Sequence, residues 1–206
     1  MKPIFITMIL LFSLFIYSIS GQENKSSFLQ QFSLEAGSGY HYPFSPAISI
    51  STSDYAGFRG FYVGANYAIT DLWGARITYA NNTFIDKNDK SNKFTIQKIT
   101  AEVSFNLLQS INSQQNPFKI LAHSGLGISG GKGQKMSDID KMVNFQIGLM
   151  PLYRISKNFN ILLDATYVLN IRQNQGYNGL YVNENIKNVV GSYLMLNMGL
   201  GINFGF

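Results

Sequence analysis

The chain alternates apolar and polar residues at a period of two along most of its length. The last segment shows this most clearly, because apolar residues occupy every second position from Leu194 to Phe206 while Asn and Gly dominate the positions between them. Such alternation places one set of side chains on each face of a β-strand. The segment therefore predicts a closing strand with one continuously apolar face.

Seven further segments carry the same pattern, and clusters of Gly, Asn, Asp and Ser separate them. After the first twenty residues no stretch shows a sustained helical period. The expected strands cover residues 31–37, 61–69, 75–79, 98–107, 118–129, 142–155, 159–170 and 194–206. The chain is thus predicted to be all-β with eight strands.

The expected connections alternate in length. Those after the first, third, fifth and seventh strands are long, about Tyr40 to Gly57, Asn81 to Lys93, Gly130 to Lys141 and Ile171 to Gly191. The connections Thr70 to Leu72 and Ser156 to Asn158 are tight, and only Gln109 to Pro117 departs from the pattern. Outer-membrane barrels show this asymmetry. We therefore expect an eight-stranded antiparallel up-and-down transmembrane β-barrel, in which the closing strand pairs with the first.

Charged residues of both signs lie in the middle of the expected strands, on the less apolar face. They favour a polar interior with the apolar face turned to lipid, although a secreted lipocalin-like barrel with the apolar face inside remains an alternative. Because an unpaired charge in a dry interior is costly, we expect a structural ion network across the lumen. Its expected members are Glu35, Arg76, Lys98 and Glu102, and Asp164 is a further interior charge.

Aromatic residues gather near the ends of the expected strands, as in the aromatic girdles of membrane barrels. The set comprises Tyr40, Tyr42, Phe58, Phe61, Trp73, Phe94, Phe118, Tyr153, Phe159 and Phe204.

The N-terminal segment differs from the rest of the chain. Lys2 precedes an apolar run from Ile4 to Ile19 that ends among small residues, which is typical of a secretory signal peptide cleaved after Ser20. We therefore expect a signal peptide over residues 1–20, a short lead over residues 21–30 and one barrel domain over residues 31–206.

The formal net charge of +5 does not indicate a nucleic-acid-binding protein, because the basic residues are scattered. The nearest approach to a cluster, Lys87, Lys90 and Lys93, is diluted by two aspartates and is interpreted as a solvated loop. The chain has no cysteine, which excludes disulfides and a lipid-modified N-terminal cysteine.

No pattern indicates catalysis or cofactor binding. "GLGISGGKG" formally matches a nucleotide-binding motif but runs into a polar loop instead of a helix, and "DKNDKSNKF" lacks the glycine and distal glutamate of a calcium loop. Ser124 and His123 are neighbours on a strand and point to opposite faces. We expect no enzyme activity, cofactor or metal, and we expect His123 to form hydrogen bonds within the barrel.

The segments "ILAHSGLGISGG" and "MVNFQIGLMPLYRISKNFNILLDATYVLNIRQ" resemble the second half of the eight-stranded barrel of the outer-membrane-protein-A-like (OmpA-like) family. The terminal "GINFGF" resembles the C-terminal signal that the barrel assembly machinery of Gram-negative bacteria recognises, which implies that role for Ile202, Phe204 and Phe206. Many members continue into a periplasmic domain that grips peptidoglycan. The sequence runs to Phe206, so that tethering role is not expected here.

These observations predict a small integral protein of the Gram-negative outer membrane with a structural or interaction role through long extracellular loops. Expected partners are outer-membrane lipid, lipopolysaccharide and the assembly machinery, and candidate partners include other outer-membrane proteins. One alternative is a narrow gated passage or a site for small apolar molecules, lined by Tyr62, Leu121, Leu162 and Tyr193. Another is an accessory subunit of a larger outer-membrane complex.

Overall fold

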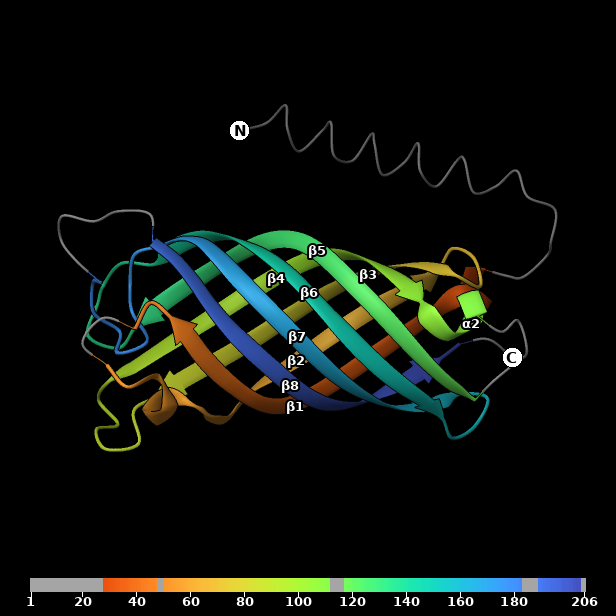
Figure 1. Ribbon diagram of the computed structural model, residues 1–206, viewed down its shortest axis with the longest axis horizontal. Coiled ribbons are helices and arrows are strands. Elements are labelled where there is room, and N and C mark those ends of the chain that lie inside the picture. The colour runs from red at the N-terminus through yellow and green to blue at the C-terminus, as the bar shows by residue number, and fades with distance from the viewer. Residues whose placement is uncertain (1–27, 48–49, 112–116, 183–188, 205–206) are drawn as a thin grey trace, which may run out of the picture.

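Eight antiparallel strands follow one another in chain order around a closed barrel (Figure 1). The computed structural model describes residues 28–47, 50–111, 117–182 and 189–204. The strands are β1 (Phe32–Ser45), β2 (Gly57–Ala68), β3 (Trp73–Ile85), β4 (Lys93–Asn106), β5 (Phe118–Gly133), β6 (Asp140–Arg154), β7 (Phe159–Gln173) and β8 (Val189–Asn203). The predicted all-β, eight-stranded up-and-down barrel is confirmed. The expected signal peptide and most of the expected lead lie outside the described residues.

The barrel closes through a long ladder between β1 and β8. Ser33 pairs with Asn203 at one end and Ser45 with Ser192 at the other. The same strand pairs with β7 on its other side, from Phe159 opposite Ile202 to Gln173 opposite Val189. The prediction that the closing strand pairs with the first is confirmed, and this pairing leaves no free sheet edge.

Three short helical elements accompany the strands: η1 (Phe28–Gln31), η2 (Thr52–Tyr55) and α2 (Leu107–Ile111). No helix in the described part of the chain is long and apolar enough to cross a membrane.

The two ends of the barrel differ in their connections. Residues 69–72 and 155–158 form tight turns at the right-hand end of Figure 1, and the third connection there contains α2. The connections at the opposite end, here called the loop end, span residues 46–56, 86–92, 134–139 and 174–188. The asymmetry predicted from the sequence is confirmed, including the exception after the fourth strand.

The strands at the loop end are longer than expected. β1 continues to Ser45 and β3 to Ile85, eight and six residues beyond the expected ends at Gly37 and Tyr79. The inward positions of these extensions include His41 and Asn82, both almost fully buried. Polar residues at inward positions interrupt the apolar alternation, so the segments resembled loops in sequence although the ladder continues through them.

Side chains alternate strictly between lumen and outer wall. In β4 every second residue from Phe94 to Asn106 is buried, and those between them face outward. β7 follows the same rule from Asn160 to Asn170. The alternation thus divides the chain into one set of residues that fills the lumen and another that covers the outside.

Candidate functional site

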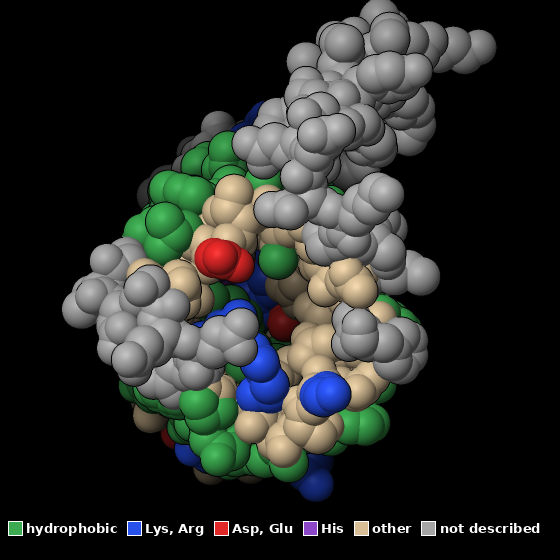
Figure 2. All heavy atoms as spheres, turned by 90° about the vertical axis from the view of Figure 1, so that its right-hand side faces the viewer, with side chains coloured by type: hydrophobic (Ala, Val, Ile, Leu, Met, Phe, Trp, Pro, Cys, Tyr) green, Lys and Arg blue, Asp and Glu red, His purple; other side chains and the backbone are tan. Residues whose placement is uncertain are grey.

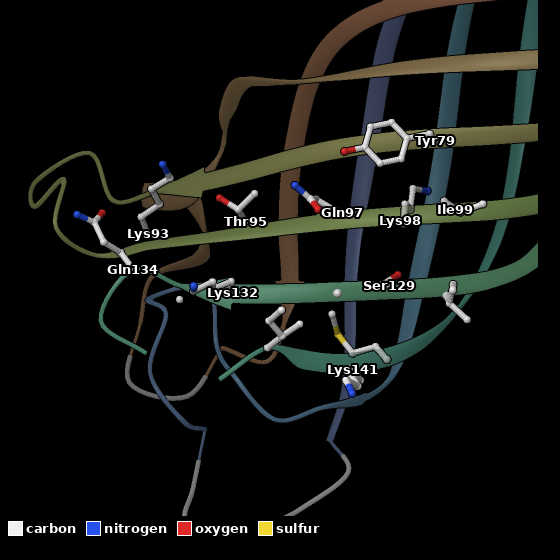
Figure 3. Close-up of a pocket in the computed structure, with 15 residues that line it drawn as sticks. Tyr79, Lys93, Thr95, Gln97, Lys98, Ile99, Ser129, Lys132, Gln134 and Lys141 are labelled. Atoms are coloured by element: carbon white, nitrogen blue, oxygen red, sulfur yellow. The ribbon is translucent and has the colours of Figure 1, made fainter. Parts of the chain in front are cut away.

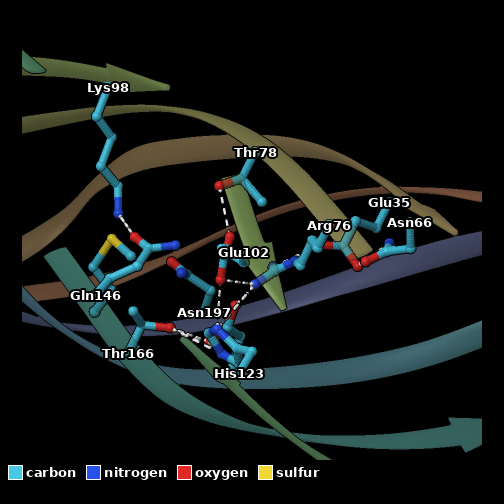
Figure 4. A network of polar contacts seen from close by, with 12 residues as sticks. Glu35, Asn66, Arg76, Thr78, Lys98, Glu102, His123, Gln146, Thr166 and Asn197 are labelled. Atoms are coloured by element: carbon cyan, nitrogen blue, oxygen red, sulfur yellow. Dashed lines mark hydrogen bonds and ion pairs between the residues drawn. The ribbon is translucent and has the colours of Figure 1, made fainter. Parts of the chain in front are cut away.

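The centre of the lumen holds an ion network built around Arg76 on β3 (Figure 4). The guanidinium donates from Nε to Glu35 Oε1 at 2.8 Å and forms an ion pair with Glu102 Oε2 at 3.3 Å. Asn66 donates to the second oxygen of Glu35 at 2.9 Å, and Thr78 to the second oxygen of Glu102 at 2.9 Å. The structure therefore brings three of the four expected network residues together, from β1, β3 and β4.

Two further residues complete this network. Nη2 of Arg76 lies 2.9 Å from Asp164 Oδ2, so the guanidinium contacts three carboxylates. His123 on β5 lies between two of these acids, with Nδ1 2.6 Å from Glu102 Oε2 and Nε2 3.3 Å from Asp164 Oδ1. A neutral imidazole donates from only one ring nitrogen, whereas an imidazolium donates from both. The two carboxylate contacts therefore fit a protonated His123, which adds a second positive charge.

The sequence did not link Asp164 and His123 to Arg76. Asp164 was an expected interior charge and His123 an expected hydrogen-bonding residue, but they lie on β7 and β5, separated from Arg76 along the sheet. Contacts across a lumen depend on how the sheet closes, which the alternation along one strand does not reveal.

Lys98 lies in the lumen outside the ion-paired group. Its side chain is almost fully buried, and Nζ donates to Gln146 Oε1 on β6. Among the described residues no ion pair joins Lys98 to a carboxylate. The structure thus places Lys98 beside the network, held by an amide oxygen.

Glycines stand opposite the large side chains of the network. Glu35 pairs across the ladder with Gly64, Glu102 with Gly125, and His123 with Gly148. A Cβ at Gly125 would come 2.6 Å from Glu102 Cγ, and one at Gly148 would come 2.5 Å from His123 Nε2. The glycines therefore provide the space that the network side chains occupy in a narrow barrel.

A cluster of aromatic and aliphatic side chains fills the lumen at the loop end. Phe84 is fully buried, with its ring centroid 4.6 Å from that of Tyr177 and 5.4 Å from that of Tyr193. Tyr177 comes from the last loop and donates its hydroxyl to the backbone oxygen of Ser192 at 2.8 Å. The loop-end cluster comprises Tyr55, Phe84, Phe94, Ile96, Met142, Val168, Tyr177, Tyr193 and Met195. Because loop residues and strand residues share one core, the loops close this end of the barrel.

Hydrogen bonds join the loops to one another. Asp140 accepts from the backbone amides of Asn174 and Gln175 at 2.6 and 2.8 Å. Gly179, whose φ of 74° suits glycine, packs so closely on Gly133 that an added Cβ would lie 2.9 Å from its Cα. The described parts of the loops therefore form a continuous cap.

A separate contact ties η2 to the connection between β3 and β4. The Tyr55 hydroxyl donates to Asp86 Oδ2 at 3.1 Å, and the backbone amide of Asn88 donates to Asp86 Oδ1 at 2.8 Å. The Asn88 amide, and to a lesser extent the Tyr55 hydroxyl, hold the pKa of the Asp86 carboxyl below its usual value. Asp86 therefore stays ionised at neutral pH and anchors Tyr55 over the loop-end cluster.

The opposite end of the lumen is open. A vestibule of about 350 Å³ enters from the short-turn end, and Figure 2 shows acidic and basic side chains along its wall. Its lining includes Glu35 of the network, Leu121, Met150 and Leu162, with Lys119 and Arg154 nearer the rim. Tyr62, Ala80, Met150 and Leu162 form a second buried apolar cluster. The four residues that the sequence suggested for an apolar passage thus fall into two groups, because Tyr193 belongs to the loop-end cluster.

The outer wall is apolar around the whole barrel. Its central positions carry exposed aliphatic side chains: Val63, Ile77, Val103, Leu126, Ile147, Leu149, Leu163, Leu196, Met198 and Leu200. Trp73, Phe118, Tyr153 and Phe159 face outward at the short-turn end, and Phe44, Phe58 and Phe61 do so toward the loop end. The expected girdle position of Phe94 is wrong, because Phe94 is fully buried in the loop-end cluster. Its place at a strand end did not reveal that its position in the alternation points inward.

The end of the chain is described as far as Phe204. Ile202 faces outward and is 43% exposed. The Phe204 amide donates to Phe32 O at 3.2 Å, and the two rings lie 5.8 Å apart. Phe206, the third residue of the expected assembly signal, lies outside the described residues.

Neither a metal-binding group nor a nucleophile and base pair emerges from the part of the chain that the structure describes. No group of three His, Cys, Asp or Glu residues there has the arrangement needed to hold a metal ion. Ser124 and His123 pair with Val103 and Ser104 at successive positions of the β4–β5 ladder, so their side chains leave opposite faces of the sheet.

Comparison with known proteins identifies the fold. No protein-family model and no curated protein matches the chain. Neisserial surface protein A is similar in structure, with a TM-score of 0.58 and 15% identity over 84% of this chain and 97% of that one. A major outer membrane protein of Thermus thermophilus gives 0.53 and 12% over 83% and 97%. The N-terminal barrel domain of Pseudomonas aeruginosa OprF gives 0.50 and 13% over 83% and 96%. The chain therefore has the fold of small eight-stranded outer-membrane barrels, which agrees with the OmpA-like resemblance.

Proposed function

We propose that the protein is an integral barrel of a Gram-negative outer membrane and acts through its outer surfaces. The observation that carries this proposal is the segregation of side chains, with aliphatic residues around the outer wall and ion-paired residues inside. A soluble barrel would gain nothing from an outer wall of this kind, whereas lipid requires it. The fold of the similar solved structures is consistent with this location.

The closed lumen supports a structural or interaction role. The loop-end cluster and the Arg76 network both occupy the lumen, and an eight-stranded barrel has little more space than its own side chains need. The capped loop end is then the surface available outside the cell. We infer that this surface meets lipopolysaccharide or partner proteins, and the proposal involves no catalytic step and no cofactor.

Assembly of the barrel is part of the same proposal. Ile202, Phe204 and Phe206 would be the signal read by the assembly machinery, and the β1–β8 ladder would then hold the closing strand. Replacing Phe206 by Ala tests this role. The expected result is less folded barrel in the outer membrane, with unchanged refolding of the purified chain into detergent, because the machinery alone reads the signal.

Fractionation of cells tests the location directly. The expected result is that the protein sediments with outer membranes, resists extraction by urea or carbonate and dissolves in mild detergent. Release by carbonate would contradict membrane integration. The mass of the native species in that detergent then separates a lone barrel from an accessory subunit of a larger complex.

The vestibule favours a second candidate function, a one-sided binding site or a gated passage. It reaches from the short-turn end to Glu35 and is partly lined by apolar Met150 and Leu162. A passage would require Arg76 to leave its carboxylates and the loop-end cluster to separate. Conductance that appears in an Arg76 variant but not in the native protein would support this alternative.

A further inference from the structure

A groove lies on the outer wall of the barrel near the loop end (Figure 3). It has a volume of about 750 Å³ and runs across β3, β4, β5 and β6. Its lining comes mainly from outward positions of these strands, among them Tyr79, Thr95, Gln97 and Ile128. The groove is therefore separate from the lumen and from its network.

Three outward lysines border this groove on three successive strands. Lys93 begins β4, Lys132 lies near the end of β5 and Lys141 near the start of β6. In the ladders Thr95 pairs with Lys132 and Gly130 pairs with Lys141, so each lysine is a diagonal neighbour of the next. Diagonal neighbours lie about 7 to 8 Å apart on one face of a sheet. The three ammonium groups thus form one basic row.

The charges of this row are not neutralised by the protein. No Asp or Glu is among the residues that line the groove. Within the described chain, the ammonium groups of Lys93, Lys132 and Lys141 form no ion pair with a carboxylate. This differs from Lys87, whose ammonium donates to Ser53 O at 2.9 Å, and from Lys135, which donates to Asn92 Oδ1 at 2.8 Å. The row is therefore free to bind an anion.

The floor of the groove is apolar. Ile99, Ile128 and Ile139 are each more than half exposed there. Gly130 leaves space between them, because an added Cβ would meet only Ile139 Cγ2 at 3.4 Å. Packing therefore does not require glycine at this position, and its effect is to keep the groove open.

We propose that this groove binds one outer-leaflet lipid whose headgroup carries more than one phosphate, the chemistry of the lipid anchor of lipopolysaccharide. The basic row contacts the phosphates, and an acyl chain lies along Ile99 and Ile128. A row of three cations suits a headgroup with several negative charges, and the apolar floor would be of no use to a small soluble anion. The inference rests on the proposed membrane location and adds a specific lipid partner.

The test compares two double variants of equal charge change. In Lys132→Gln/Lys141→Gln the basic row loses two charges, whereas in the control Lys90→Gln/Lys157→Gln two exposed lysines outside the groove are replaced. Each folded protein is titrated in nonionic detergent with bis-phosphorylated lipid A, and bound lipid is measured by native mass spectrometry. We expect about 30-fold weaker binding for the groove variant, from about a tenfold or smaller contribution of each lysine, and unchanged binding for the control.

Two further arms identify the ligand. Gly130→Leu keeps all three lysines but fills the groove, so lipid binding should be lost while weak binding of inorganic pyrophosphate stays. Phosphatidylethanolamine should bind poorly to every variant. Pyrophosphate that displaces lipid A from the native protein at similar concentration would overturn the lipid assignment, and equal lipid binding by both double variants would overturn the groove itself.

Folding and membrane insertion are measured separately. Heat-dependent electrophoretic mobility reports the folded barrel, and resistance to carbonate extraction from vesicles reports insertion. If the first groove variant does not fold, Lys93→Gln/Lys141→Gln replaces it. A native protein that fails to insert would contradict the proposed location, whereas variants that insert normally and bind lipid normally would contradict only the groove.

Discussion

The guanidinium of Arg76 and the carboxylate of Asp164 meet at 2.9 Å although β3 and β7 stand on opposite sides of the eight-stranded barrel. One arginine therefore spans the lumen from wall to wall. Glu35 and Glu102 contact the same guanidinium from β1 and β4, so this single side chain joins four strands.

Loss of Arg76 should strongly destabilise the folded barrel. In Arg76→Ala three buried carboxylates lose their common cation, and removal of one partner of a buried ion pair costs about 3 to 5 kcal/mol. The free energy of unfolding, from urea titration in detergent, checks this. Arg154→Ala, at an exposed strand end, is the matched control and should change the value by no more than about 0.5 kcal/mol. Equal midpoints for the two variants would contradict the structural role of the network.

His123 should carry protons on both ring nitrogens at neutral pH. This state follows from its contacts with Glu102 at 2.6 Å and Asp164 at 3.3 Å. Nitrogen NMR of the folded protein in micelles distinguishes an imidazolium from either neutral tautomer, and His41, whose Nε2 contacts the neutral amide oxygen of Asn197, serves as the internal comparison. A neutral His123 at pH 7 would mean that the second positive charge of the network is absent. His123→Gln should cost about 1 to 3 kcal/mol, because one carboxylate loses its donor.

Phe84→Ala should loosen the cap at the loop end. The fully buried ring packs against Tyr177 and Tyr193, and truncation of a buried phenylalanine costs about 3 to 5 kcal/mol. Because Tyr177 comes from the last loop, limited proteolysis should cleave that loop faster in the variant. Phe58→Ala removes a ring that is 78% exposed and should leave the cleavage rate near the native value. Identical rates for native and Phe84→Ala proteins would show that the cluster does not hold the loop.

A charge on the outer wall should impair membrane insertion. Met198 is 64% exposed on β8, between the aromatic residues of the two ends, and an arginine at the bilayer midplane costs about 2 to 4 kcal/mol. We expect Met198→Arg to reduce the folded fraction in vesicles. Leu180→Arg places the same charge in the last loop, where the side chain is 41% exposed, and should insert normally. Unimpaired insertion of Met198→Arg would argue against a lipid-facing wall.

The sequence predicted most of the architecture because each strand records its two faces separately. The alternation around Glu102 and Leu200 was enough to assign one side chain to the lumen and the other to the outer wall. It was not enough at strand ends, where Phe94 has the composition of a girdle residue but the inward position of a core residue. Tertiary packing over the barrel mouth decided that case.

The candidate site was predictable only in part. Interior charges could be identified one strand at a time, but the contacts of Arg76 with Asp164 and His123 depend on the closure of the sheet. The lysine row on the outer wall was hidden for the same reason. Lys93, Lys132 and Lys141 are far apart in the chain and become neighbours through two ladders.

The closed lumen within a membrane-inserted barrel is the central claim, and ion conductance tests it most directly. The native protein is inserted into planar bilayers, and insertion is verified by heat-dependent mobility of protein recovered from vesicles of the same lipid. The account predicts no stable conductance steps, because the loop-end cluster and the Arg76 network both block the lumen. Long-lived steps from the native, fully inserted protein would contradict it.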